Sequence, residues 1–193
     1  LFLSLALTLS CALAAPTIHG YQEGMAKASE NGLWGFADAS GRVVIPIRYQ
    51  SVLDFTLGTA LVRTNNKMGL IRQDGLSLLQ PEYDTLENLG YGLYMAQKGN
   101  QWGVVSMLAF PDEQGGTTQE FFSITYDAVR TQKVDGLDVL VLTANGIDTV
   151  VPISTLKDQM VRRQVPSAQF PLIKGRIPSF DDVSPRDWFS LWV

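Results

Sequence analysis

Short apolar segments alternate with turn signals along most of the chain, at a spacing typical of strands. Three of these segments, MAKASE, TALVRT and LYMAQK, each end in a pair of turn residues: Asn31-Gly32, Asn65-Asn66 and Gly99-Asn100. Asn and Gly tolerate the positive φ that two-residue hairpin turns need. A second segment follows each turn pair, and a third follows it in the first two copies. We expect this third segment to end at Pro46 and at Pro81, because proline cannot donate to a strand ladder. The pattern predicts antiparallel meanders of about three strands.

The pattern repeats with a period of 34 residues. A bulky residue followed by glycine recurs at this step: Trp34-Gly35, Met68-Gly69 and Trp102-Gly103. Other positions keep the same step: Gly24, Gly58 and Gly92; Phe36, Leu70 and Val104; Tyr49 and Tyr83; and the apolar series Tyr21, Phe55 and Leu89. One meander alone cannot bury its apolar side, so we expect the copies to stack on one another.

We therefore expect a mainly all-β fold of tandem antiparallel β-hairpin or meander repeats over residues 15–153. The copies fall near residues 24–57, 58–91 and 92–134, and a degenerate copy spans 135–153. In this last copy Asp148-Thr149 replaces the Trp-Gly pair, which is typical of a capping repeat. Residues 154–193 are predicted to be a Pro-rich tail with one or two short helices. The first has Ser154 as N-cap and one apolar side: Leu156, Met160 and Val161.

The third copy carries an insertion at its second turn. Gly103 and Tyr126 are 23 residues apart, whereas Gly35 and Tyr49 are 14 apart, so nine residues are added. The added stretch, PDEQGGTTQE, is polar and glycine-rich, and insertions in repeat arrays usually extend loops on one face. Because loops on a rigid array carry recognition, we expect this one to contact a partner. The candidate partner-binding residues are Asp112, Glu113, Gln114, Thr117 and Thr118.

A second candidate surface lies in the tail. Trp188 and Trp192 are four residues apart in a segment that reads as a helical turn, so they share one side of it. They either close the end of the array or dock on a partner.

The first residues read as an export signal. An apolar run from Leu1 to Leu13 overlaps Ala12-Leu13-Ala14, a small-residue cleavage pattern, so residues 1–14 are predicted to be a signal peptide. The run is shorter than the ~20 residues that a membrane-spanning helix needs. An alternative is a lipoprotein signal with a lipid anchor on Cys11. Either reading places the protein in the periplasm or outside the cell.

The repeated residues resemble the WG-repeat family of bacterial proteins. Its unit runs roughly K-W-G-F-I-D, a turn with Gly, V-I-P-P-x-Y-D, F-x-x-G and A-x-V. The first copy matches it at these positions: Trp34, Gly35, Phe36, Asp38, Gly41, Ile45, Pro46, Tyr49, Phe55, Gly58, Ala60 and Val62. Later copies match less fully, and the resemblance covers about residues 21–150. It implies β-hairpin repeats with a binding or scaffolding role and brings no catalytic residues.

Composition and charge restrict the functional classes. The chain has 193 residues, 46% hydrophobic and 18% charged, which is typical of a globular protein. Its formal net charge is −4 and its basic residues are scattered, which argues against nucleic acid as a partner. The single histidine, His19, lies near the predicted mature terminus and reads as solvated rather than catalytic. We find no metal-binding or phosphate-binding motif and predict no metal and no cofactor.

The remaining side chains with possible chemistry are carboxylates and aromatics. Asp38 and Asp74 sit near turns, where Asp is expected to bond the backbone. The adjacent pairs Asp112-Glu113 and Asp181-Asp182 do not converge on a strand, because neighbouring side chains face opposite ways. Trp34 and Trp102 share their slot with Met68, so we interpret them as structural packing residues rather than a sugar-stacking row.

These observations favour an exported, non-catalytic binding or scaffold protein whose partner is a protein or a glycan of the bacterial envelope. The alternative is a carboxylate-dependent hydrolase of cell-wall glycan, which would need two carboxyl groups held across a cleft.

Overall fold

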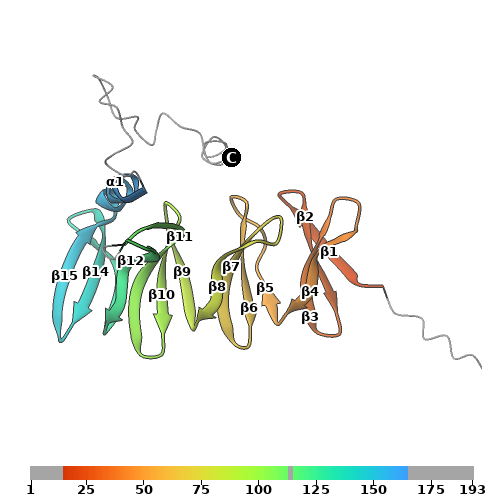
Figure 1. Ribbon diagram of the computed structural model, residues 1–193, viewed down its shortest axis with the longest axis horizontal. Helices are drawn as coiled ribbons and strands as arrows, with labels where there is room; N and C mark the ends of the chain where they lie inside the picture. The colour runs from red at the N-terminus through yellow and green to blue at the C-terminus, as the bar shows by residue number, and fades with distance from the viewer. Residues whose placement is uncertain (1–14, 113–114, 165–193) are drawn as a thin grey trace, which may run out of the picture. The chain divides into compact units, whose positions relative to one another are not determined.

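The computed structural model describes residues 15–112 and 115–164. Over this part the chain forms fifteen strands and one helix (Figure 1). The chain divides into two compact units, the first ending at Glu82 and the second beginning at Tyr83. The mainly β architecture of tandem antiparallel sheets confirms the predicted fold class.

The first unit contains two four-stranded antiparallel sheets. Sheet 1 has the order β1-β2-β3-β4, and sheet 2 has the order β5-β6-β7-β8. The strands of sheet 1 are β1 (Thr17–Gln22), β2 (Met25–Glu30), β3 (Leu33–Asp38) and β4 (Val43–Tyr49). Those of sheet 2 are β5 (Ser51–Val52), β6 (Thr59–Thr64), β7 (Lys67–Arg72) and β8 (Ser77–Tyr83).

The second unit contains sheets 3 and 4 and the helix. Sheet 3 pairs its strands in the order β12-β11-β10-β9, and sheet 4 is three-stranded, β13-β14-β15. Sheet 3 consists of β9 (Thr85–Gly90), β10 (Leu93–Lys98), β11 (Gln101–Pro111) and β12 (Thr117–Tyr126). Sheet 4 consists of β13 (Ala128–Val134), β14 (Leu137–Ala144) and β15 (Ile147–Pro152), and α1 (Ile153–Gln164) follows it.

Each of the first three sheets has one strand more than the predicted meander. The extra strands are β1, β5 and β9, which precede the leading glycines. Their sequences lack clear alternation, and β5 is only two residues long, so the pattern alone did not reveal them. The repeating structural unit is therefore a four-stranded sheet that begins at Thr17, Ser51 and Thr85.

The predicted turns are present. Asn31 and Gly32 have φ values of 51° and 77°, and Asn145 and Gly146 have 51° and 75°. A second series of positive-φ pairs joins the first two strands of each sheet: Glu23-Gly24, Leu57-Gly58, Tyr91-Gly92 and Asp135-Gly136. In this series the first residue is not glycine or asparagine, so its left-handed backbone costs free energy that the hairpins on either side must offset.

The core of the first unit lies between its two sheets. Phe36 from β3 and Phe55, just before β6, are each 1% exposed, and their ring centroids are 4.6 Å apart. The other buried members of this cluster come from both sheets: Met25, Ile45, Tyr49, Ala60, Val62 and Ile71. Burial of one such large side chain contributes roughly 2 kcal/mol, so this apolar contact is a principal source of stability in the unit.

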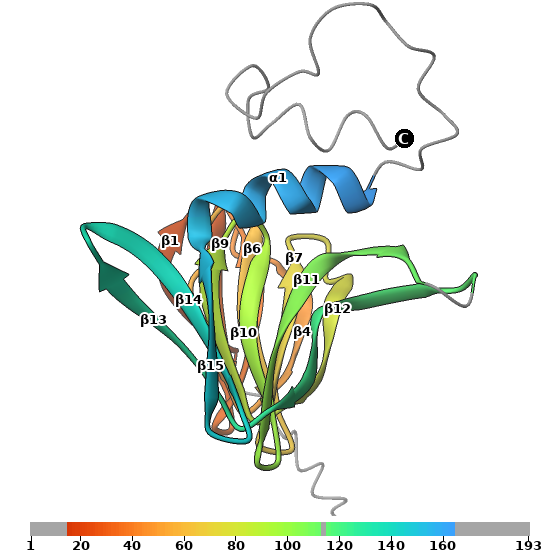
Figure 2. The same ribbon diagram turned by 90° about the vertical axis from the view of Figure 1, so that its left-hand side faces the viewer.

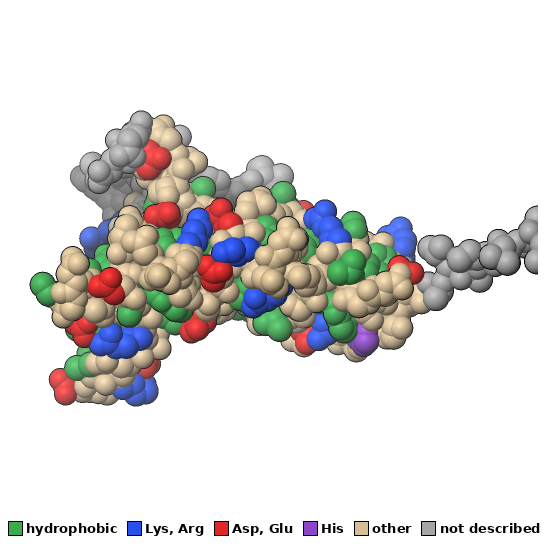
Figure 3. Space-filling view, turned by 90° about the horizontal axis from the view of Figure 1, so that it is seen from below, with side chains coloured by type: hydrophobic (Ala, Val, Ile, Leu, Met, Phe, Trp, Pro, Cys, Tyr) green, Lys and Arg blue, Asp and Glu red, His purple; other side chains and the backbone are tan. Residues whose placement is uncertain are grey.

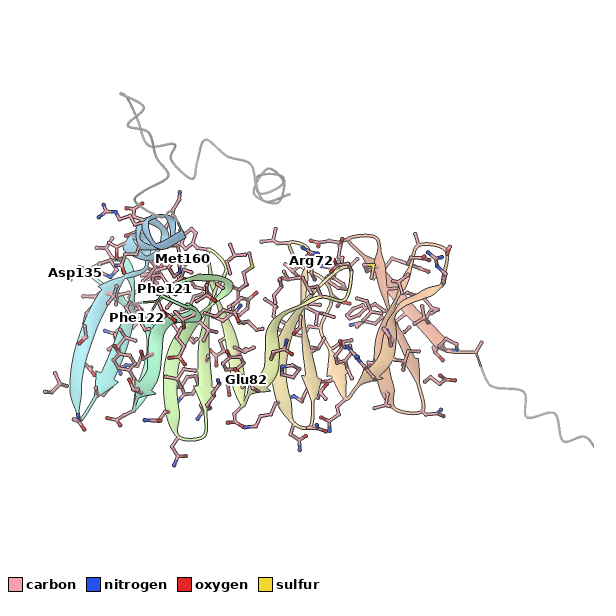
Figure 4. All side chains as sticks on the ribbon, in the orientation of Figure 1. Arg72, Glu82, Phe121, Phe122, Asp135 and Met160 are labelled. Atoms are coloured by element: carbon pink, nitrogen blue, oxygen red, sulfur yellow. The ribbon has the colours of Figure 1, made fainter. Side chains whose placement is uncertain are left out.

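The core of the second unit involves three elements. Sheet 3 contributes Val104 and Phe121, sheet 4 contributes Leu140 and Leu142, and α1 contributes Leu156 and Met160. Phe121 of β12 and Met160 of α1 belong to this buried cluster, and both are labelled in Figure 4. The expected apolar side of the helix is thus confirmed for Leu156 and Met160, while the Val161 side chain lies outside the described part.

The start of the helix differs from the prediction. It begins at Ile153, one residue before Ser154, and the Thr155 hydroxyl donates to the Pro152 carbonyl at 2.8 Å. Ser154 is therefore inside the first turn rather than at the N-cap.

The glycine of each Trp-Gly or Met-Gly pair allows two backbones to meet. A Cβ on Gly35 would lie 2.4 Å from the Ile45 carbonyl oxygen. On Gly69 and Gly103 it would lie 2.7 Å from the carbonyl oxygens of Leu79 and Phe122. Since no real Cβ approaches backbone this closely, only glycine fits where the last strand of the sheet crosses β3, β7 or β11.

Candidate partner-binding site

The insertion in the third copy forms a long hairpin rather than a loop. Its residues lengthen β11 and β12 to eleven and ten residues, and the pairing continues outward through Phe110–Thr118 and Pro111–Thr117. Figure 2 shows this hairpin projecting beyond the rest of sheet 3. We call the segment from Pro111 to Thr117 the hairpin tip. The polar composition indicated a loop, but the alternation of the flanking residues supports strands.

Buried aromatic residues hold the base of this hairpin. Phe110 and Phe121 are 4% and 2% exposed, and their rings meet edge to face with centroids 6.2 Å apart. The Phe122 ring packs edge to face on the Phe121 ring, with centroids 5.0 Å apart. Edge-to-face pairs of this kind add about 1 kcal/mol beyond the area they bury. The projecting strands therefore start from a rigid base.

Backbone carbonyls on β11 and in the β9–β10 turn add to this base as hydrogen-bond acceptors. The Met107 N–H donates to the Gly92 carbonyl at 2.9 Å. The Gln119 side-chain amide donates to the Met107 carbonyl at 3.3 Å. A bulge in the β11–β12 pairing between Val105 and Phe110 accompanies these contacts and redirects the outer strands.

The Asp112 carboxylate closes the hairpin tip. It accepts a hydrogen bond from the Gly116 N–H at 2.7 Å, and the Asp112 N–H donates to the Gly116 carbonyl at 3.1 Å. The half-buried Asp112 therefore shapes the turn. Glu113 and Gln114, which are also candidate partner-binding residues, lie outside the described residues.

The other two candidates of the insertion lie on β12. Thr117 is exposed, whereas Thr118 is half-buried and its hydroxyl accepts a hydrogen bond from the Glu120 N–H at 3.0 Å. Because β12 is an end strand of sheet 3, its outer backbone edge can pair with an added strand. Thr117 and the exposed Glu120 flank that edge. Trp188 and Trp192, the tail candidates, are beyond the described part of the chain.

The single histidine is held in place rather than solvated at a loose terminus. His19 lies on β1, where its Nε2 is 2.9 Å from the Ser29 hydroxyl oxygen. Its ring contacts the half-buried Trp34 indole, with centroids 4.9 Å apart. A Ser-His-Asp triad would require a carboxylate on the imidazole, and among the described residues none contacts it. The arrangement is that of a packed, hydrogen-bonded pair.

The indoles occupy the margin of the cores. Trp34 and Trp102 are both half-buried, and Trp102 packs against the core of the second unit. Full burial occurs two residues further along the same side, at Phe36 and Val104. Both indoles are thus partly covered by neighbouring side chains, as expected of packing residues.

The carboxylates near the second turns bond to their own turns. Asp38 accepts from the Ser40 hydroxyl at 2.5 Å and from the Ser40 and Arg42 N–H groups, and the Ser40 hydroxyl chiefly lowers its pKa from 3.8 to about 2. Asp74 accepts from the Arg72 guanidinium and the Leu76 N–H, which lower its pKa to about 2. These contacts confirm the turn role predicted for both residues.

Two further features of the described part of the chain concern metal binding and membrane spanning. There, no group of three or more His, Cys, Asp or Glu side chains could hold a metal ion. No helix among the described residues is long and apolar enough to cross a membrane. On the side seen in Figure 3, basic and acidic side chains are interspersed within each unit.

These features define a protein built from antiparallel sheets of three or four strands that repeat along the chain, with a projecting hairpin on the third. The family model of the WG containing repeat matches residues 34–67 and 68–102. The match confirms the resemblance seen in the sequence, and the chain carries WG repeats over these residues. No curated protein and no solved structure matches the chain.

The matched repeats are out of phase with the sheets. The first match begins at Trp34 on β3 and ends at Lys67, at the start of β7. It therefore takes the last two strands of sheet 1 and the first two of sheet 2. One sequence repeat thus contains both partners of a sheet-to-sheet contact, such as Phe36 and Phe55.

Proposed function

We propose that this WG-repeat protein is exported and acts as a binding or scaffold protein, using the β11–β12 hairpin to contact an envelope partner. The observation that carries the proposal is the hairpin itself: it projects from sheet 3 on a buried aromatic base and presents the edge of β12. A rigid base lowers the entropy lost on binding, because the contacting strands are already ordered.

The preferred partner is a protein segment, since an edge strand offers backbone donors and acceptors that an extended peptide satisfies by adding a strand. Envelope glycan is the second candidate, through the hydroxyls of Thr117 and Thr118 and the carboxylate of Glu120. The proposal assigns no catalytic step. A hydrolase would need a converging pair of carboxylates. Both adjacent pairs in the sequence include residues outside the described part: Glu113 in the first, and Asp181 and Asp182 in the second.

The binding proposal is tested by shortening the hairpin without disturbing its base. Replacing Pro111–Thr117 by Asn-Gly joins Phe110 to Thr118 through a two-residue turn and keeps the buried Phe110 and Phe121. We expect the shortened chain to fold normally and to lose the envelope proteins or glycan fragments that the wild-type chain captures. Capture at wild-type levels would rule out the hairpin.

A point variant refines the test. Thr117→Arg places a bulky charge at the exposed edge of β12 and should weaken capture. Thr131→Arg is the matched control, because Thr131 is an exposed threonine on β13, which is also an end strand. Equal weakening by both variants would show that the effect is not specific to the hairpin.

Export is tested separately, by the mass of the N-terminal peptide after expression in a bacterium with an initiating Met. Cleavage after Ala14 gives a chain that begins at Ala15. An acylated Cys11 at the new terminus would indicate the lipoprotein alternative. A cytoplasmic chain that keeps residues 1–14 would contradict export.

A further inference from the structure

Sheet 4 presents an apolar side that is buried at Val139 (3% exposed) and Val141 (1% exposed) and exposed at the apolar residues around them. Register places Val134 beside Leu137 and Val141 beside Val150, on the side opposite Leu140 and Leu142. Leu137 is 61% exposed, Val150 52% and Val134 37%. We call this side, with its exposed residues Val134, Leu137 and Val150, the end face.

The end face is equivalent to the side of sheet 1 that packs on sheet 2, and to the side of sheet 3 that packs on sheet 4. Asp148-Thr149 aligns with the Trp-Gly pairs, so Val150 occupies the position of Phe36 in sheet 1 and of Val104 in sheet 3. Phe36 and Val104 are 1% and 0% exposed, because sheet 2 covers the first and sheet 4 covers the second. At Val150 the equivalent cover comes from outside the described residues or is absent.

Sheet 1, in the first unit, presents the complementary side. Tyr21 pairs with Ala26 on the side opposite Phe36, and Tyr21 is 52% exposed. Leu33, on the same side of β3, is 40% exposed. We call this side the start face. Tyr21 stands 34 residues before Phe55, which is 1% exposed and packs on Phe36.

We propose that a second copy of the chain stacks its start face on the end face, so that Tyr21 of one copy packs on Val150 of the other. The contact continues the interface already present in the first unit, where the equivalent residues Phe55 and Phe36 meet at 4.6 Å. It is a head-to-tail contact between two different faces, which leads to open chains of molecules or to closed rings.

A polar group limits the strength of this contact. Arg130, Thr143 and Asp148 form a hydrogen-bonded trio on the end face near the Asn145-Gly146 turn, with an Arg130–Asp148 ion pair at 2.6 Å. Such a polar rim beside an apolar patch is typical of reversible rather than obligate interfaces. A sheet that served only to terminate the array would be expected to be polar over this whole side. The exposed Val134, Leu137 and Val150 depart from that expectation.

The proposal is tested by sedimentation velocity of the purified chain over a concentration series from about 10 µM to about 1 mM, a range suited to weak association. We expect the wild-type chain to associate with rising concentration. Val150→Lys and Tyr21→Glu should each weaken association about tenfold or more, because each places a charge at the centre of the contact. Leu76→Lys is the control, since Leu76 is 54% exposed in the β7–β8 connection and belongs to neither face.

Mixing the two variants shows whether the contact between copies is head-to-tail or symmetric. Each variant alone lacks one face, but a mixture contains an intact end face from Tyr21→Glu and an intact start face from Val150→Lys. Head-to-tail stacking therefore predicts complexes of one molecule of each in the mixture only. A symmetric contact between two end faces would leave Tyr21→Glu unaffected and would overturn the proposal.

Two other results also overturn it. A wild-type chain that stays monomeric up to about 1 mM would show that no second copy binds at useful strength, whether residues 165–193 or another protein covers the end face. Association unchanged in both variants would place the contact elsewhere. Because both substituted positions are more than half exposed, both variants should fold, and Leu137→Lys supplies a second variant of the end face if Val150→Lys does not.

Discussion

The Asp127 carboxylate accepts a 2.6 Å hydrogen bond from the backbone N–H of Asn145, at the β14–β15 turn. Asp127 is the single residue between sheets 3 and 4, and its own N–H donates to the Thr143 carbonyl at 2.8 Å. Single residues also link sheet 1 to sheet 2 (Gln50) and sheet 2 to sheet 3 (Asp84), and they make the same kind of contact. Asp84 accepts from the Gly99 N–H at 2.7 Å, and Gln50 accepts from the Asn66 N–H at 2.7 Å. Each link thus fixes the hairpin turn of the sheet that follows it.

Removing this contact should destabilise the second unit. Asp127→Ala leaves the Asn145 N–H to water, and we expect a loss of roughly 1 kcal/mol in the free energy of unfolding. Asp127→Asn is the matched control, because its amide oxygen still accepts the hydrogen bond, so it should lose less. Urea unfolding curves of the three proteins measure the difference. Equal losses in both variants would mean that the carboxylate acts in some other way.

The glycine of the Trp-Gly pair should not tolerate a side chain. In Gly35→Ala the new Cβ would meet the Ile45 carbonyl oxygen at 2.4 Å, so β4 must move away from β3. We expect a loss of about 3 kcal/mol or more, as for other severe steric conflicts in a core. Gly20→Ala is the control, since a Cβ there meets nothing within 4 Å and its backbone is not left-handed. Thermal unfolding compares the two, and similar melting temperatures would contradict the close approach.

Stability should fall in acid in a specific pH range. The pKa of Asp38 and of Asp74 is about 2 in the folded chain, against 3.8 for an unperturbed Asp. Since the folded-state pKa is the lower one, both carboxylates stabilise the fold above about pH 4 and lose that contribution as the pH falls through about 2. The double variant Asp38→Asn with Asp74→Asn should show a shallower decline between these values. An unchanged slope of unfolding free energy against pH would contradict the assignment.

The indole slot should accept methionine. Met68 occupies in sheet 2 the position that Trp34 occupies in sheet 1, and both are half-buried. Trp34→Met should therefore cost about 1 kcal/mol, whereas Trp34→Ala should cost about 2 to 3 kcal/mol because it removes most of the buried surface. Chemical denaturation ranks the two variants. A methionine as damaging as alanine would show that the ring itself, against His19, is what the position requires.

Much of the fold is present in the sequence as local chemistry. The Asn-Gly and Asn-Asn turns and the 34-residue period predict the hairpins, and the structure has them. The prediction that prolines end strands was wrong, because Pro46 lies inside β4 and Pro81 inside β8. The extra strand of each sheet was not predicted, because β5 is two residues long and carries no alternation. Ladder pairing with β6, a contact made in space, defines that strand.

The candidate site was predicted less fully. Composition located the insertion but indicated a loop, because Gly115, Gly116 and the threonines resemble turn residues. In the structure those threonines belong to β12 and pair with β11, next to the buried Phe110–Phe121 contact. The end face was not identified at all, although the alignment of Val150 with Phe36 is visible in the sequence. Burial at one copy and exposure at another appear only in three dimensions.

The central claim is that the two sheets within each unit bury each other's apolar sides, and the Phe36–Phe55 contact tests it most directly. Nuclear Overhauser effects between aromatic protons report distances of about 5 Å or less, and the two ring centroids are 4.6 Å apart. The account predicts strong ring-to-ring signals, together with signals between Phe36 and its strand partner Ile45. Signals from Phe36 to Ile45 without any to Phe55 would show hairpins that form but do not stack, which contradicts the account.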